Sequence, residues 1–131
     1  MDQLLDLRAI EGRFSPHDSY LRHQLDRRKV CLTSAEPRSL AEFVGGCLDE
    51  PRSDEKWCVS KEIFPGVRTH IMYRSDEEFG ERLEAYFSGD RIRIMPGEDL
   101  AELALAIVNQ MVRQVRSCTA ADKLPEICLR I

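Results

Sequence analysis

Four side chains with the chemistry of a binding site fall in two segments that alternate polar and apolar residues. Arg68 and His70 lie in the first segment, and Arg91 and Arg93 lie in the second. Because alternate side chains of a strand point to the same face of a sheet, the four would form one cationic patch if the two strands are neighbours. Such a patch predicts binding of a small anion or an acidic protein segment, and the alternative is a solvated face with cross-strand ion pairs.

Catalysis has little support among the side chains that usually perform it. The chain has three histidines, and His17 and His23 lie six residues apart on a predicted helix, so they point to different sides and cannot chelate one metal ion. The sequence contains neither a glycine-rich phosphate loop nor a Gly-x-Ser-x-Gly nucleophile motif. We therefore predict no catalytic residues and no cofactor.

The cysteines predict neither a zinc site nor a disulfide framework. Their number, five, is odd, and no two of them form a Cys-x-x-Cys pair. Zinc sites usually take ligands from such close pairs, so a metal site built from Cys31, Cys47, Cys58 and a histidine is disfavoured. We expect free, reduced thiols at all five positions, which are Cys31, Cys47, Cys58, Cys118 and Cys128.

Length and charge limit the classes of protein to which the chain can belong. With 131 residues, 43% of them hydrophobic, it has the size of a single domain over residues 1–131 and can bury a core. The net charge of −4 is evenly spread, without the positive field that attracts nucleic acid. The apolar runs are far shorter than the roughly 20 residues of a membrane helix, and the N-terminus lacks the pattern of a signal peptide. We expect a cytoplasmic protein whose partner is another protein or a second copy of itself.

Capping signals predict helices in the first third of the chain. Ser15 is placed to cap a helix over 16–28, with a proline at its first position. A capping box at Ser39 predicts a short helix that ends near Gly45. The leucines of segment 2–10 are compatible with a further, leading helix.

A hairpin and a long helix define the predicted fold class. Residues 57–73 alternate around a Pro-Gly turn, strands are expected near 83–95, and 30–33 is compatible with a short strand. A helix over 98–116 carries an apolar stripe, whose line of buried residues should include Leu103, Ile107 and Met111. We therefore predict an α+β fold, in which a mainly antiparallel sheet is packed by the C-terminal helix and by N-terminal helices.

The segment 75–90 leaves one alternative open. Its aromatic residues and Leu83 have helical spacing after an acidic start, and a helix here would give a ferredoxin-like βαββαβ order. Its second half also alternates and leads into a good hairpin loop at 88–90, which favours a strand in an antiparallel meander.

The second half of the chain carries a recognisable order of motifs. It consists of an apolar stretch at 67–73, Asp-Glu-Glu-Phe at 76–79, a second stretch at 83–87 and Pro-Gly-Glu-Asp-Leu-Ala at 96–101. Over residues 64–116 this order resembles an uncharacterised prokaryotic family called domain of unknown function 3786. The family has proline just after its acidic motif, where this chain has Gly80, and because proline disrupts a helix the resemblance implies a strand at 83–87. It implies no activity, since none is established for the family.

Two hypotheses about function follow. The first is a small, non-catalytic accessory or protein-interaction module that binds through the sheet face or the apolar C-terminus. In that terminus Ile127, Leu129 and Ile131 alternate with polar residues, which predicts docking on the edge of a sheet. The second is a small-molecule or anion-binding domain, with or without catalytic activity, whose site is formed by Arg68, His70, Arg91 and Arg93.

Overall fold

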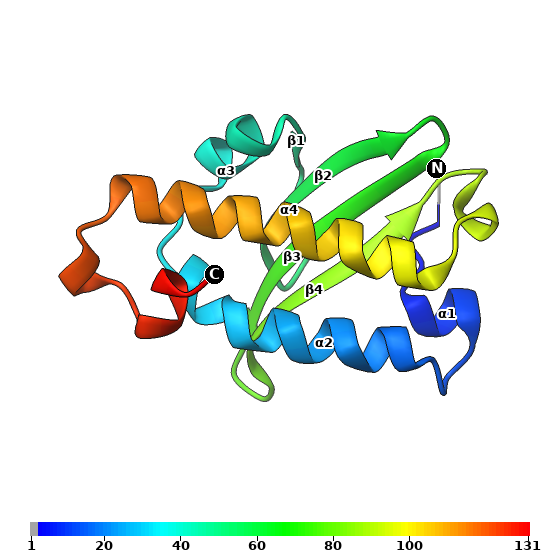
Figure 1. The fold of residues 1–131 in the computed structure, drawn as a ribbon, viewed down its shortest axis with the longest axis horizontal. Coiled ribbons are helices and arrows are strands. Elements are labelled where there is room, and N and C mark those ends of the chain that lie inside the picture. The colour runs from blue at the N-terminus through cyan, green and yellow to red at the C-terminus, as the bar shows by residue number, and fades with distance from the viewer. Residues whose placement is uncertain (1–2) are drawn as a thin grey trace.

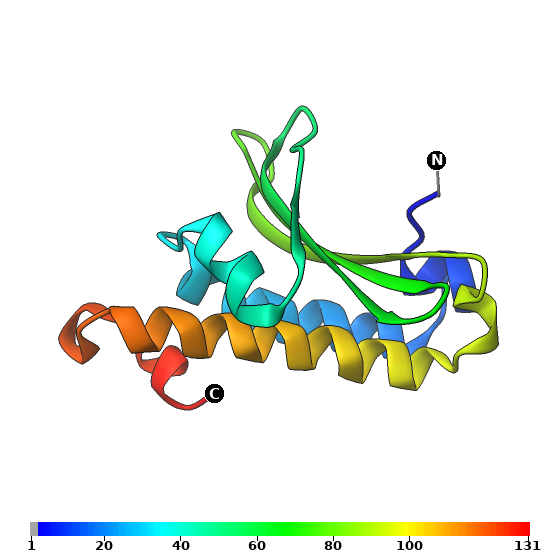
Figure 2. The ribbon, with the colours of Figure 1, turned by 90° about the horizontal axis from the view of Figure 1, so that it is seen from above.

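Two long helices, α2 (Pro16–Arg28) and α4 (Gly97–Cys118), lie side by side against one face of a twisted antiparallel sheet (Figures 1 and 2). The computed structural model describes residues 3–131. The strands are hydrogen-bonded in sequence order and are β1 (Cys47–Asp49), β2 (Glu55–Phe64), β3 (Val67–Asp76) and β4 (Gly80–Ser88). The prediction of an α+β fold with an antiparallel sheet and a long C-terminal helix is confirmed.

Local capping explains where the helices begin. Ser15 caps α2, as predicted. Helix α3 (Pro37–Val44) begins before Ser39, so the predicted capping box is wrong. The carboxylate of Glu36 accepts the N–H groups of the first turn instead, and Ser39 donates its hydroxyl to the same carboxylate. Gly45 ends the helix as expected, with a φ of 72° that glycine adopts at little cost.

The N-terminal segment forms less helix than its leucines suggest. Helix α1 covers only Leu7–Glu11, and residues 1–2 of the chain lie outside the described part. Leu5 pairs instead with the free edge of β4, exchanging two main-chain hydrogen bonds of 2.8 and 2.7 Å with Phe87. This pairing covers part of an edge strand that would otherwise be open.

The predicted hairpin is the centre of the sheet. Strands β2 and β3 are joined at Pro65 and Gly66, and Gly66 takes a φ of 80°. Alternate residues of both strands point toward α2 and α4, and Trp57 stacks on Tyr73 with 5.7 Å between ring centroids. This inward face forms the core with the helices, as the period of two predicts.

Helix α4 covers the sheet with a stripe of fully buried residues. These are Leu100, Ala104, Val108, Met111 and Val112. Ile107 is also buried, but Leu103 is only half-buried, so the expectation for Leu103 is wrong. The stripe runs through Ala104, one residue after Leu103, because α4 packs against α2 and α3 as well as β3. No helix within residues 3–131, α4 included, is long and apolar enough to cross a membrane.

Three segments differ from the sequence prediction. Residues 91–94 are not a strand: Gly89, at a φ of 118°, redirects the chain, and a 3-10 helix follows at Ile92–Ile94. Residues 30–33 are part of another 3-10 helix, Lys29–Leu32. The helical alternative for 75–90 is wrong because β4 occupies it, and this excludes the ferredoxin-like order.

The C-terminal tail docks on the helices and not on the sheet. Its last turn is a 3-10 helix, Glu126–Leu129, that packs against α2 and α4. Cys128 of this turn is fully buried and forms a disulfide with Cys31, so the expectation of five free thiols is wrong. Arg116 donates to the carbonyl oxygen of Cys128 at 3.3 Å. The tail therefore docks within its own chain, as predicted, but it contacts helices and not the edge of the sheet.

Candidate functional site

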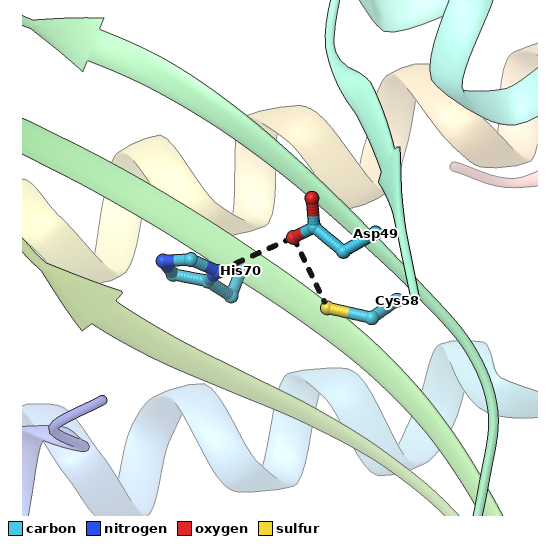
Figure 3. A group of neighbouring side chains, drawn as sticks. All are labelled: Asp49, Cys58 and His70. Atoms are coloured by element: carbon cyan, nitrogen blue, oxygen red, sulfur yellow. Dashed lines mark hydrogen bonds and ion pairs between the residues drawn. The ribbon is translucent and has the colours of Figure 1, made fainter. Parts of the chain in front are cut away.

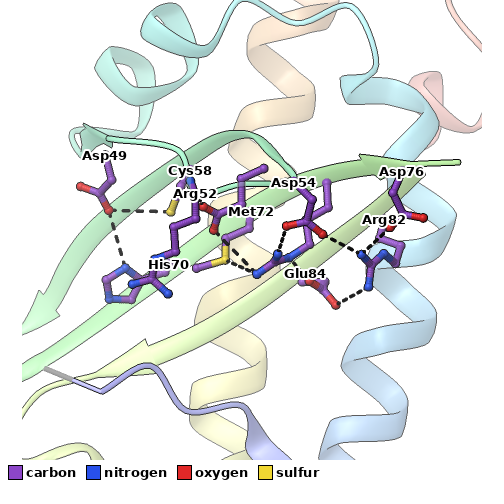
Figure 4. A network of polar contacts seen from close by, with 11 residues as sticks. Asp49, Arg52, Asp54, Cys58, His70, Met72, Asp76, Arg82 and Glu84 are labelled. Atoms are coloured by element: carbon purple, nitrogen blue, oxygen red, sulfur yellow. Dashed lines mark hydrogen bonds and ion pairs between the residues drawn. The ribbon is translucent and has the colours of Figure 1, made fainter. Parts of the chain in front are cut away.

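The face of the sheet that points away from α2 and α4 is here called the outer face (Figure 2). Its polar side chains are largely buried. Strand register places Asp49 opposite Cys58 and Ser60 opposite His70. Cys58, Ser60 and His70 are each less than a tenth exposed. The loop between β1 and β2 folds over this area, where Arg52 lines the same small cavity as the cluster (Figure 4).

Asp49, Cys58 and His70 come from three neighbouring strands and point toward one another (Figure 3). The Oδ2 atom of Asp49 lies 3.7 Å from the Sγ of Cys58, which donates to it, and 3.7 Å from the Nδ1 of His70. One oxygen, one sulfur and one nitrogen atom of the three side chains all lie within 4.8 Å of one another. The cluster therefore combines three kinds of metal-binding atom in a small volume.

Burial determines the protonation states in the cluster. Burial lowers the pKa of His70, so its imidazole is neutral at neutral pH. Burial, and then the negative charge of Asp49, raises the pKa of Cys58 to about 12, so this side chain is a thiol. The Nε2 atom of His70 shares a 2.7 Å hydrogen bond with the hydroxyl of Ser88. Because a buried, protonated thiol is a poor nucleophile, the arrangement does not fit a cysteine–histidine catalytic pair.

An ion-pair network lies beside the cluster (Figure 4). Arg74 of β3 pairs with Asp54 of the β1–β2 loop and with Glu84 of β4. Arg82 of β4 pairs with Asp54 at 3.2 Å and with Asp76 at 2.9 Å. The Arg74 side chain is only 18% exposed, so solvent screens its pairs weakly. The network ties the loop that follows β1 to two other strands.

The four residues predicted to form a cationic patch occupy two separate parts of the structure. Arg68 and His70 lie on the outer face, where Arg68 donates to the hydroxyl of Ser60 at 3.0 Å. Arg91 and Arg93 are exposed in the turn after β4, which is not a strand and has no register with β3. His70, Arg91 and Arg93 each line a different hollow of the surface. The shared face on which the patch depended does not form.

A second surface lies where the β2–β3 turn meets the segment after β4, and we call it the sheet-end surface. A groove of about 420 Å³ runs through it, with Val67 at its buried side. Phe64 and Ile94 are large apolar side chains that are 51% and 77% exposed. The surface consists of Phe64, Pro65, Arg91, Ile94 and Met95.

Asp49 is the residue of the cluster that sequence analysis missed. It lies at the start of a polar stretch, which is typical of a loop, whereas its strand has only three residues. The available signal is weak, because Cys47-Leu48-Asp49 alternates polar and apolar residues directly after a glycine pair. A strand so short is recognised only by its pairing with β2, which the local sequence does not reveal.

Comparisons with known proteins provide no relative for the chain. No family model, no curated protein and no solved structure matches it. The resemblance of 64–116 to domain of unknown function 3786 therefore stays a prediction.

Proposed function

We propose that the chain is a non-catalytic protein-interaction module that binds an extended apolar and acidic segment of another protein at the sheet-end surface. The observation that carries the proposal is the open groove flanked by Phe64 and Ile94. Single exposed apolar residues are normal on protein surfaces, whereas apolar side chains that gather around a groove are typical of interaction sites.

The free edge of β2 favours an extended partner. Strand β1 pairs only with Cys58–Ser60, and no other described strand pairs with residues 61–64 on that side. Phe64, the last residue of this unpaired stretch, also lines the groove. An extended segment that adds to the edge would place every second side chain over the groove, and main-chain hydrogen bonds would supply affinity.

The charge of the surface selects an acidic segment. Among residues 3–131, Arg91 is the only charged residue lining the groove, and Arg93 follows it in the same exposed turn. Neither arginine forms an ion pair within the described part of the chain. A partner carboxylate can therefore pair with Arg91 without breaking an existing contact, in the bidentate geometry that arginine favours.

We prefer this surface to an anion site formed by Arg68, His70, Arg91 and Arg93. Arg68 already donates to Ser60, and the ring nitrogens of His70 face Ser88 and Asp49. A small anion would have to displace these contacts.

A cytoplasmic location is part of the proposal, and the disulfide makes it testable. Reducing compartments keep cysteines as thiols, so chain taken rapidly from cytoplasm should have Cys31 and Cys128 reduced or only partly bonded. Alkylation of thiols at lysis, followed by mass spectrometry, measures this. Fully bonded protein from intact cells would contradict the location.

The interaction is tested with short synthetic peptides that alternate apolar residues with aspartate, and with matched peptides that carry lysine instead. We expect the aspartate peptides to bind, to move the amide resonances of residues 61–67 and 91–95, and to bind more weakly at high salt. Arg91→Glu should reverse the preference between the two peptide sets, because it inverts the charge beside the groove.

Two control variants separate the surface from general effects. Arg113→Glu makes the same charge change at an exposed position near the other end of α4, and Phe79→Ser removes an exposed aromatic residue from the β3–β4 turn. Both should leave binding unchanged, whereas Ile94→Ser should weaken it. Failure of every peptide to bind, or a dimer of the chain alone that Ile94→Ser dissociates, would contradict the proposal.

A further inference from the structure

We infer that Asp49, Cys58 and His70 form a binding site for one divalent transition-metal ion of the Zn²⁺ or Co²⁺ class, with a coordination position left open toward the adjacent cavity. The site lies on the outer face and is independent of the sheet-end surface, so either proposal can fail without the other.

The three donor atoms suit this class of ion. Thiolate sulfur, imidazole nitrogen and carboxylate oxygen are the ligands of Zn²⁺, whereas Mg²⁺ and Ca²⁺ take oxygen almost exclusively. Bond lengths of about 2.3 Å to sulfur and about 2.0–2.1 Å to nitrogen or oxygen place tetrahedral ligands about 3.3–3.6 Å apart. The two distances from Asp49 Oδ2, to Cys58 Sγ and to His70 Nδ1, are both 3.7 Å. The third pair, Cys58 Sγ and His70 Nδ1, lies within 4.8 Å, so coordination is completed when these two side chains move toward the ion.

The hydrogen bond between His70 and Ser88 orients the ring for this role. It engages Nε2 at 2.7 Å and leaves Nδ1 facing Asp49. Metal-binding histidines usually make such a bond through the nitrogen that does not bind the ion, because it sets both tautomer and ring angle. Both residues are buried, so the orientation is maintained by packing as well as by the bond.

The scaffold holds the three ligands in place before an ion arrives. Each lies on a different strand, and Asp49 is the direct register partner of Cys58. Ligands on paired strands are positioned more accurately than ligands on loops. The ion pairs of Arg74 with Asp54 and Glu84 tie down the loop beside the site.

The cavity next to the three side chains leaves the fourth coordination position of the ion open. It measures about 140 Å³ and, besides the three ligands, is lined by Leu4, Glu50, Arg52, Glu55 and Met72. A structural zinc site is closed by four protein ligands, whereas a site with three ligands accepts water or a small molecule as the fourth. Entry of the ion breaks the S–H bond of Cys58, forms a sulfur–metal bond and releases one proton to solvent, so charge and atoms balance.

The test uses Co²⁺ as a spectroscopic substitute, added to the intact, disulfide-bonded chain without chelating reductant. We expect one equivalent to bind and to produce the sulfur-to-cobalt charge-transfer band and the intense visible bands of a four-coordinate ion. Zn²⁺ should displace it. Cys58→Ser should abolish the charge-transfer band, and Asp49→Asn and His70→Gln should each weaken binding by at least about 10-fold.

Matched variants separate these ligands from other residues. Cys47→Ser and Cys118→Ser change the two exposed free cysteines and should leave the cobalt spectrum unchanged. Ser88→Ala should keep the spectrum but weaken binding by about 10–100-fold, the usual effect of removing such a supporting bond.

One measurement avoids variants at buried positions, which can fail to fold. In the wild-type chain, one equivalent of Zn²⁺ should move the Cβ resonance of Cys58 and the imidazole resonances of His70 while leaving the Cβ resonance of Cys47 unmoved. Absence of stoichiometric binding, binding that leaves the Cys58 and His70 resonances unmoved, or a charge-transfer band that survives in Cys58→Ser would each overturn the inference.

Discussion

Replacing both Cys31 and Cys128 with serine should lower the free energy of unfolding by about 2–4 kcal/mol. The disulfide joins residues 97 positions apart, so it closes most of the chain into one loop. The chain-entropy model assigns about 4.7 kcal/mol to a loop of about 100 residues, and measured values usually fall below the model. For a domain of this size each kcal/mol corresponds to about 3–4 °C, so the melting temperature should fall by about 6–16 °C.

Urea and thermal unfolding followed by circular dichroism measure this change in the oxidised wild type and in the double variant. Added reductant should destabilise the wild type to a similar extent and should have no effect on the double variant. Cys118→Ser, at an exposed and free cysteine, is the matched control and should unfold like the wild type. The reasoning is refuted if oxidised and reduced wild type agree within about 0.5 kcal/mol. It is also refuted if chain purified and kept under oxidising conditions, then denatured without reductant, titrates five thiols rather than the three that the structure leaves free.

The remaining predictions concern the core and the free thiols. Met111→Ala should cost about 2–5 kcal/mol in urea unfolding because Met111 is fully buried, whereas Leu103→Ala should cost clearly less because Leu103 is half-buried. Equal costs would contradict the packing described for α4. At pH 8 a thiol reagent should modify Cys47 and Cys118 quickly and Cys58 slowly in the native chain, since burial both covers Cys58 and raises its pKa to about 12. Three equally fast thiols would show that the outer face is open.

Several elements could be predicted because their causes are local. Ser15 caps α2 through a contact within one turn, and the Pro65-Gly66 turn joins two alternating stretches that need no distant partner to be recognised. The apolar residues of α4 repeat at the period of a helix over more than five turns, so the helix itself is predicted securely. Its most buried residues include Ala104, one position after Leu103. Periodicity shows which side of a helix is buried, but the neighbouring helices decide where that side is centred.

A local sequence pattern can predict the wrong element where the same pattern is compatible with two kinds of secondary structure. The alternation of residues 91–94 is that of a strand, yet the edge of β4 that such a strand would occupy is partly taken by Leu5. The capping signal at Ser39 is genuine by composition, but Glu36 starts the helix earlier. Residues outside the pattern determine both structures: Leu5, distant in the chain, at the edge of β4, and Glu36, only three residues away, at the start of α3.

Local sequence patterns are sufficient to predict the fold class, the main helices and the β2–β3 hairpin, because these depend on interactions between residues close in the chain. The tertiary structure alone decided the disulfide between cysteines 97 positions apart and the meeting of Asp49, Cys58 and His70 on three strands. Neither can be read from spacing, since sheet register and helix docking bring together residues that are distant in the chain. The candidate metal site therefore has no motif in the sequence, although each of its ligands is plainly present there.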